Sequence, residues 1–291
     1  MAERENWASW AVISTASSML FVPGNRPERF EKAVSAGPDV VIVDLEDAVP
    51  EADKAMARAN VRNWVADAQS TVVRINAAGS PWYEEDLRAV ISAGCPVMVP
   101  KAEDPRTLAA LTARLAPGVG VVPLVETAVG VLAAPGLCLV PGVIRPAFGN
   151  VDLATELGVA PGDHDALRHA RSLLVLAAAA AGIASPVDGV TTELDDEAVL
   201  LADTRHAVTL GLWGKMCVHP RQIALVHAAL APTEQQLAWA RRVVDTAEGH
   251  AGSGGAISVD GQMVDRPVVE RARRLLDRAQ GRPRTRSGGR P

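Results

Sequence analysis

The chain alternates short β-branched runs with longer segments of helical period, and this alternation constrains the fold more than any other feature. The segments between the runs are amphipathic, and most close on a glycine that suits a helix C-cap. Alternating strands and helices of this kind indicate βα units on a parallel sheet. Eight runs have the length and composition of strands: 18–24, 40–47, 71–76, 97–103, 119–127, 143–152, 185–190 and 214–220.

Eight strands linked by helical crossovers predict an α/β fold, the TIM (β/α)₈ barrel. A doubly wound open sheet is the structural alternative. That fold would want a glycine-rich turn after the first strand, and FVPGNRPERF has a single glycine there. We therefore expect the barrel.

The sequence divides into four expected parts. Residues 1–17 are an N-terminal extension, 18–231 the barrel, 232–278 a C-terminal helix and lid segment, and 279–291 a disordered basic tail. Within the third part, a predicted helix precedes the glycine-rich AGSGGAI, and SVDGQMVDRPVVERARRLLDRA indicates a hairpin or lid and a last helix. Such extra elements often cover an active site, in the same or a neighbouring subunit.

Charge and hydrophobicity limit the class of partner. A net charge of -5 and a pI near 5.7 provide no electrostatic basis for binding nucleic acid or a membrane surface. The most apolar run, LLVLAAAAAGIA at 173–184, is too short to cross a bilayer. We expect a cytoplasmic protein with small-molecule partners.

The three cysteines, Cys95, Cys138 and Cys217, are far apart and form no CxxC pair. With no clustered histidines either, this pattern argues against a zinc site and against a disulfide framework. A reducing compartment fits the pattern.

Charged side chains follow the predicted strands at their C-terminal ends, where TIM barrels carry their catalytic groups. Six converging carboxylates would repel one another unless protons or a divalent cation compensated them. Oxygen ligands indicate Mg²⁺ or Mn²⁺, and Mg²⁺ takes only one or two carboxylates from a protein. The residues at these ends are Asp44, Glu46, Asp47, Arg74, Lys101, Glu126, Asp152, Asp188 and His219.

Several of these residues also have a structural interpretation. Glu126 could be a solvated rim residue, and Asp152 could cap the helix that follows it. Asp44 follows directly on a buried run and is expected to anchor the strand end. Lys101 and Asp188 could pair with rim charges of opposite sign.

The sequence words that carry these residues resemble the citrate lyase β-subunit-like family, within the HpcH/HpaI aldolase group that includes malyl-CoA and citramalyl-CoA lyases. The resemblance runs in order from residue 18 to residue 276. The words are SMLFVPGNRPERFEKA, VVIVDLEDAVPEADKAMAR, VVRINAAGSPWYEEDL, VMVPKAED, PLVETAVGV, FGNVDLATELG, DGVTTEL, WGKMCVHPRQI, APTEQQLAWARRVV and VDGQMVDRPVVERARRLL.

The resemblance implies a Mg²⁺-dependent lyase that cleaves or forms a carbon–carbon bond next to a thioester, with an acyl-CoA and a 2-oxo acid as reactants. It implies that Glu126 and Asp152 ligate the metal and that Arg74 contacts substrate oxygens. Residues around the metal would be Glu46, Asp47 and Lys101.

The resemblance also implies that Asp265 is the acid or base that exchanges a proton with the acyl-CoA enolate, acting in trans in a homo-oligomer, a trimer or hexamer. Two departures from the family pattern alter the rim: Val151 replaces an acidic residue before Asp152, and Trp213 replaces an Asp before Gly-Lys. The alternatives are an aldolase acting on free 2-oxo acids, a citrate lyase β chain working with an acyl-carrier subunit, and a catalytically idle barrel.

Overall fold

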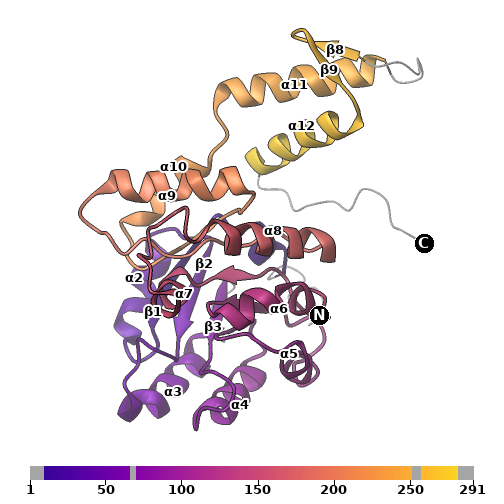
Figure 1. Cartoon of the computed structure of the whole chain (residues 1–291). Helices are drawn as coiled ribbons and strands as arrows, with labels where there is room; N and C mark the ends of the chain where they lie inside the picture. The colour runs from indigo at the N-terminus through magenta and orange to yellow at the C-terminus, as the bar shows by residue number, and fades with distance from the viewer. Residues whose placement is uncertain (1–9, 66–69, 251–256, 281–291) are drawn as a thin grey trace. The chain divides into compact units, whose positions relative to one another are not determined.

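The computed structural model describes residues 10–65, 70–250 and 257–280 (Figure 1). The chain forms two compact units, the first ending at Leu230 and the second beginning at Ala231. Most of the expected N-terminal extension, the glycine-rich 251–256 segment and nearly all of the expected basic tail lie outside the described residues. No helix among the described residues is long and apolar enough to cross a membrane.

Parallel strands form the centre of the first unit, in the order β6-β5-β4-β3-β2-β1-β7. Neighbours in this order are also neighbours in sequence except at β1 and β7, which pair through Ser18↔Lys215. The strands are β1 (Ser18–Pro23), β2 (Val40–Asp44), β3 (Thr71–Arg74), β4 (Val97–Val99), β5 (Val121–Val125), β6 (Ala147–Phe148) and β7 (Lys215–Cys217).

The sheet closes on itself through two bridge residues. Val187 pairs in parallel with Ala147 of β6, and Asp188 pairs in parallel with Lys215 of β7. The predicted strand at 185–190 is therefore present only as this two-residue bridge. The closed ring of parallel strands confirms the predicted TIM-barrel fold class.

Helices surround the strands (Figure 1). Left-handed glycines end several of them, as at Gly94 and Gly182, where φ is 65° and 68°. The prediction of a strand over 143–152 was wrong at its end, because a helix begins at Asn150. The helices are η1 (Pro27–Arg29), α2 (Phe30–Ser35), η2 (Glu51–Asp53), α3 (Lys54–Val65), α4 (Tyr83–Ala93), α5 (Pro105–Thr112), α6 (Ala128–Cys138), α7 (Asn150–Leu157), α8 (Arg168–Ala181), α9 (Glu197–Leu210) and α10 (Gln222–Leu230).

Two hydrophobic cores lie on the two faces of the sheet. The larger joins strand residues to helix residues such as Phe30 and Leu87, so it fills the layer between sheet and helices. The smaller holds strand residues such as Ile42 and Val72 together with Ile13, so it fills the barrel interior. Successive strand residues alternate between the two faces. Each strand therefore has one parity that faces inward and one that faces the helices.

A buried arginine closes the end of the barrel where the strands begin. Arg145 is fully buried, and its guanidinium donates to the carbonyl oxygens of Ser185, Ile13, Ala16 and Trp213. These four acceptors belong to three separate segments of the chain. Arg145 thus ties the chain before β1 to the last two crossovers.

The second unit consists of α11 (Glu234–Gly249), a β8–β9 hairpin (Ile257–Val259 and Gln262–Val264) and α12 (Arg266–Ala279). A Thr233 capping box opens α11. The hairpin turns at Asp260 and Gly261, whose φ values of 52° and 77° fit a tight Asp-Gly turn. The apolar residues of this unit form a small core of their own around Ala240, Val243 and Ala272.

Candidate active site

Strand parity brings three of the predicted site residues into the barrel interior. Asp44, Arg74 and Glu126 each lie two residues beyond a residue of the interior core, namely Ile42, Val72 and Leu124. Because side chains repeat every second residue along a strand, all three point into the barrel at the end where the strands finish. The sequence had shown them only as neighbours of strand ends.

Asp44 ends β2 and holds Arg74. Its two carboxylate oxygens accept the backbone N–H groups of Glu46 at 2.9 Å and Ala48 at 3.0 Å, which turns the chain out of the strand. The same oxygens accept Nε and Nη2 of Arg74, each at 2.7 Å. This bidentate pair is almost fully buried and fixes the plane of the guanidinium. Although burial opposes it, Asp44 raises the pKa of Arg74.

Glu46 lies between the two cations of the site. Its Oε1 accepts Nζ of Lys101 at 2.7 Å, and its Oε2 lies 3.0 Å from Nη1 of Arg74. Burial raises the pKa of Glu46, while Arg74 and Lys101 oppose that rise. The Asp47 side chain is 62% exposed, with its Oδ2 at 3.7 Å from Nη1 of Arg74, so it lies at the open edge of this cluster.

Lys101 connects the two sides of the cluster. Its backbone is left-handed, with φ at 47°, a conformation that costs a non-glycine residue about 1–2 kcal/mol. In this conformation its N–H donates to Oε1 of Glu126 at 2.8 Å, while its ammonium lies 3.8 Å from Oδ2 of Asp152. Burial lowers the pKa of Lys101, but the hydrogen bond to Glu46 outweighs it and the pKa is raised.

Glu126 and Asp152 therefore meet at Lys101. Burial, with the negative charges of Glu46 and Asp152 beside it, raises the pKa of Glu126 to about 8. The backbone after β6 can lie this close to Glu126 only because residue 149 is a glycine. A Cβ at Gly149 would lie 2.3 Å from Cβ of Glu126. Asp152 lies in the first turn of α7 rather than at a strand end, with 42% of its side chain exposed.

The donor set fits a hard divalent cation. A carboxyl whose pKa is raised by burial and by neighbouring carboxylates is one that a positive ion would return to its ionised form. One further oxygen, Oε2 of Glu46, is buried and accepts no hydrogen bond, although it pairs with the charge of Arg74. No group of three or more His, Cys, Asp or Glu side chains in the described part of the chain could hold a metal alone. A pair of carboxylates completed by water or substrate is what Mg²⁺ commonly uses.

Asp188 forms a different kind of cluster. Its neighbour Val187 belongs to the interior core, so Asp188 faces the helix layer. There it accepts Nε of Arg171 at 2.8 Å and Nζ of Lys215 at 3.1 Å, and all three side chains are buried. The expectation that Asp188 joins the other carboxylates was wrong, because the parity of this short segment turns it the other way. Its pairing with opposite charges was the structural alternative.

Asp265 lies in the second unit, at the N-terminus of α12. Its Oδ1 accepts the backbone N–H of Val268 at 3.1 Å, which makes Asp265 the N-cap of that helix. The residue is exposed.

Sequence reasoning missed two residues that hold the loop after β2. Lys54 is buried, and its ammonium donates at 2.7 Å to the carbonyl oxygens of Leu45 and Glu46 and to Oδ1 of Asn76. Asn76 donates in turn to the Leu45 carbonyl at 2.8 Å. Both residues lie inside the family words VVIVDLEDAVPEADKAMAR and VVRINAAG, which was the available signal.

The cysteines take no part in the site. Cys95, Cys138 and Cys217 are free and buried, and burial raises the pKa of each thiol to about 12. All three therefore remain protonated at neutral pH.

Comparison with known proteins identifies the family. The HpcH/HpaI aldolase/citrate lyase family matches residues 17–220, and a family described as C-C bond lyase of the TIM-barrel fold matches residues 171–281. The chain belongs to the HpcH/HpaI aldolase/citrate lyase family. This membership confirms the predicted family and the predicted enzyme class, a lyase.

Individual relatives of this lyase match over most of their length. A citrate lyase subunit beta-like protein of Mycobacterium tuberculosis is 41% identical over 267 residues, 89% of this chain and 94% of the relative. A (3S)-malyl-CoA thioesterase of Cereibacter sphaeroides is 33% identical over 273 residues, covering 90% and 94%. The crystal structure of CitE from M. tuberculosis with magnesium, acetoacetate and coenzyme A superposes with a TM-score of 0.79 at 39% identity, covering 91% and 98%.

Proposed function

We propose that this lyase is Mg²⁺-dependent and cleaves a 3-hydroxyacyl-CoA of the malyl-, citramalyl- or citryl-CoA type into a 2-oxo acid and an acyl-CoA. The observation that carries the proposal is the meeting of Glu126 and Asp152 at Lys101, inside a barrel end where carboxylates outnumber cations. The M. tuberculosis relative holds magnesium and coenzyme A together, which supports the same ligands here.

Glu126 and Asp152 would hold the Mg²⁺, with Mn²⁺ as a substitute of similar chemistry. When bound, the ion supplies a Lewis acid beside the substrate oxygens. The protein prepares this place by burying Glu126 and by leaving Asp152 partly open to solvent. Glu46, Asp47 and Lys101 would surround the ion and keep the net charge of the site near balance.

Arg74 would bind the substrate carboxylate or keto oxygen. Asp44 occupies its Nε and Nη2, so the guanidinium cannot rotate, and its Nη1 remains on the side of Glu46 and Asp47. A guanidinium fixed in this way opposes negative charge that develops on a substrate oxygen without having to reorganise.

Asp265 would supply the proton that completes the reaction. When the bond between the hydroxyl-bearing carbon and the thioester α-carbon breaks, its electron pair stays on the α-carbon as the acyl-CoA enolate. The substrate hydroxyl gives its proton to water, the Asp265 carboxyl gives one proton to the α-carbon, and the resulting carboxylate regains a proton from water, so no net proton is consumed. In the condensing direction the Asp265 carboxylate would remove that same proton.

A cavity of about 220 Å³ borders Lys101 on the helix side. Its apolar walls include Tyr83, Val99, Leu108 and Leu111. We propose that it takes an apolar part of the acyl-CoA, because the polar cluster offers no comparable surface for a chain of methylene groups.

The proposal includes the assembly and the place of the enzyme. Asp265 would act in the site of a neighbouring subunit of a trimer or hexamer. The barrel would span 18–231, the helix and lid segment 232–278, and the reaction would take place in the cytoplasm, where the three buried thiols of Cys95, Cys138 and Cys217 stay reduced.

One experiment tests the function directly. The full chain is incubated with Mg²⁺ and, in turn, malyl-, methylmalyl-, citramalyl- and citryl-CoA, and release of 2-oxo acid is measured. We expect release with one of these esters and loss of release in EDTA. Release of free CoA without a 2-oxo acid would show a thioesterase, as the name of the C. sphaeroides relative describes.

The same assay, with other substrates, tests the three alternative functions. Cleavage of pyruvate-derived aldols without CoA would show an aldolase acting on free 2-oxo acids. Activity only after addition of a citryl-loaded acyl-carrier subunit would show a citrate lyase β chain. No turnover in any arm, with no Mg²⁺ binding, would leave a catalytically idle barrel.

A further inference from the structure

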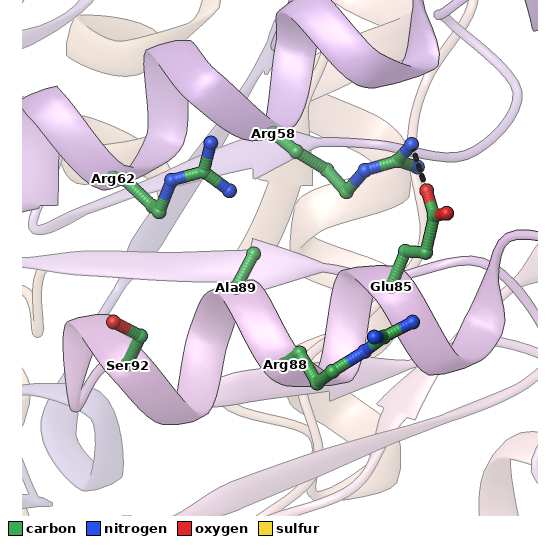
Figure 2. A pocket seen from close by; sticks show the side chains of 6 residues that line it. All are labelled: Arg58, Arg62, Glu85, Arg88, Ala89 and Ser92. Carbon is green, nitrogen blue, oxygen red and sulfur yellow. Dashed lines mark ion pairs between the residues drawn. The ribbon is translucent and has the colours of Figure 1, made fainter.

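A cavity of about 370 Å³ lies between α3 and α4, among residues that take no part in the proposed active site (Figure 2). Helical spacing explains how its lining forms, because residues three, four and seven apart share one face of a helix. Two arginines of α3 lie across it from an arginine and a glutamate of α4, and the small side chain of Ala89 lies between the two helices. The lining residues are Arg58 and Arg62 of α3 and Glu85, Arg88, Ala89 and Ser92 of α4.

The positive charges of this cavity are only partly neutralised. Arg58 forms an ion pair with Glu85 (Figure 2). Its Nη1 also lies 3.2 Å from Oδ1 of Asp86. The Nε of Arg88 donates a hydrogen bond to the backbone carbonyl oxygen of Glu84 at 3.1 Å. Arg62 and Arg88 have no ion pair with any carboxylate of the described residues. Like charges this close repel one another, and a bound anion would relieve that repulsion.

Glu85 is the replaceable partner in this arrangement. Its side chain is 54% exposed, whereas that of Arg58 is 9% exposed. An anion with several oxygens could take the place of the Glu85 carboxylate on Arg58 and reach the terminal nitrogens of Arg62 or Arg88 as well. Guanidinium forks bind phosphoryl oxygens in this bidentate way.

Buried hydrogen bonds continue from Arg58 towards the active-site loop. The Asp86 carboxylate is fully buried, and its Oδ2 accepts Asn76 N at 2.9 Å and Asn76 Nδ2 at 2.5 Å. Asn76 accepts Lys54 at 2.7 Å, and Lys54 holds the carbonyl oxygens of Leu45 and Glu46. The cavity is thus joined through Arg58, Asp86, Asn76 and Lys54 to the loop that carries Glu46.

We propose that the α3–α4 cavity binds a small anion with several phosphoryl oxygens, and that its occupancy orders the 44–48 loop through Asp86, Asn76 and Lys54. The bound anion would bridge α3 to α4 across Arg58 and Arg62 or Arg88. Arg58 would then be held from the cavity side as well as by Asp86, and the hydrogen bonds behind it would open less often.

The binding part is tested by calorimetric titration of the Mg²⁺-free full chain at constant ionic strength. The probes are orthophosphate, tripolyphosphate, a nucleoside triphosphate and succinate. We expect one binding site per chain. Tripolyphosphate should bind more tightly than orthophosphate, and succinate should bind most weakly. The nucleoside triphosphate distinguishes free from nucleotide-borne phosphoryl groups, because a tighter fit than tripolyphosphate would assign the site to a nucleotide.

Two double variants separate this site from general charge attraction. The double variant Arg62→Gln, Arg88→Gln should weaken the binding of tripolyphosphate about tenfold or more, because each substitution removes a charge-assisted hydrogen bond. Arg205→Gln with Arg241→Gln removes the same charge from exposed helix positions of α9 and α11 and should leave affinity unchanged. Equal weakening by both pairs, binding of succinate as tight as tripolyphosphate, or no binding would overturn the site.

The coupling part is measured by hydrogen exchange on the unmutated protein with and without saturating tripolyphosphate. The amides of Glu46, Ala48 and Asn76 are the reporters, since each donates to a buried carboxylate. We expect about fivefold slower exchange with the anion, the lower end for coupled sites. Unchanged exchange at all three amides despite binding would overturn the coupling. Neither measurement depends on lyase activity.

Discussion

The barrel holds two charged clusters that differ in balance. In one, Asp188 is enclosed by Arg171 and Lys215, and these cations hold the pKa of its carboxyl below the usual value although burial opposes them. In the other, negative charges crowd Glu126, and its pKa is raised to about 8. In the first cluster one carboxylate faces two cations, whereas in the second the carboxylates outnumber the cations.

The difference follows from strand parity and not from composition. Glu126 lies on the inward parity of β5 and reaches the open end of the barrel interior. Asp188 follows the inward Val187 and turns towards α8, where Arg171 covers it. Two carboxylates near strand ends therefore have opposite uses, one structural and one available to a ligand.

The largest expected effect comes from removing the only carboxylate that pairs with Arg171 and Lys215 among the described residues. Asp188→Ala would leave Arg171 and Lys215 buried without a counter-ion, and the free energy of unfolding should fall by about 3–5 kcal/mol. Urea unfolding followed by circular dichroism measures it. The matched control is Asp165→Ala, whose carboxylate pairs with Arg168 in solvent, so its loss should lower the free energy of unfolding far less. A loss at Asp188 no larger than at Asp165 would contradict the assignment.

Asp152→Ala should have the reverse profile. Its side chain is 42% exposed, so we expect the free energy of unfolding to change by about 1 kcal/mol or less. Turnover with Mg²⁺ should fall by more than about a hundredfold, the upper range for residues that merely support a metal ligand. Initial rates of 2-oxo acid release at saturating Mg²⁺ measure it. Wild-type turnover in this variant would remove Asp152 from the metal site.

Glu126 should make the metal-free protein less stable as the pH rises. Its pKa is raised from 4.5 to about 8 on folding. The contribution of the protonated carboxyl to the free energy of unfolding is therefore complete below about pH 4.5 and is lost progressively up to about pH 8. Each pH unit in that window removes about 1.4 kcal/mol. Glu126→Gln should flatten this dependence, as measured by urea unfolding in EDTA between pH 5 and pH 9. An unchanged slope would mean that Glu126 is already ionised.

The smallest expected signal concerns the group that lies outside both clusters. Asp265→Ala and Glu126→Ala proteins should each be inactive, and mixing them should restore activity in about one site in four if Asp265 acts across subunits. Assays after subunit exchange, verified by mass spectrometry, measure the recovery. Exchange without recovered turnover would place Asp265 in the site of its own chain or outside catalysis.

Much of the fold could be predicted from local pattern. Apolar runs separated by amphipathic segments specify βα units, and eight such units favour a closed barrel. Strand lengths were less predictable, because Asp44 ends β2 by capturing the N–H groups of Glu46 and Ala48. A side chain that competes with the sheet for backbone hydrogen bonds is not visible in hydrophobic pattern alone.

The candidate site could be predicted in part. Arg74, Lys101, Glu126 and Asp152 were named from strand ends and family words, and the structure brings them into one cluster with Glu46. Their roles in catalysis remain proposals. The buried links from Lys54 to Asn76 and on to Asp86 could not be predicted, since they join residues that are distant in sequence.

The sequence by itself determined the alternation of strands and helices, the family, and the presence of acidic groups at the ends of the strands, because these depend on order and local periodicity. Only the tertiary structure decided which carboxylates share a cation. Asp188 receives Arg171 from α8 and Lys215 from β7, while Glu126 accepts the backbone N–H of Lys101, whose ammonium pairs with Glu46 and Asp152 instead. The physical reason is that a carboxylate's charge state depends on burial and on neighbours supplied by distant parts of the chain.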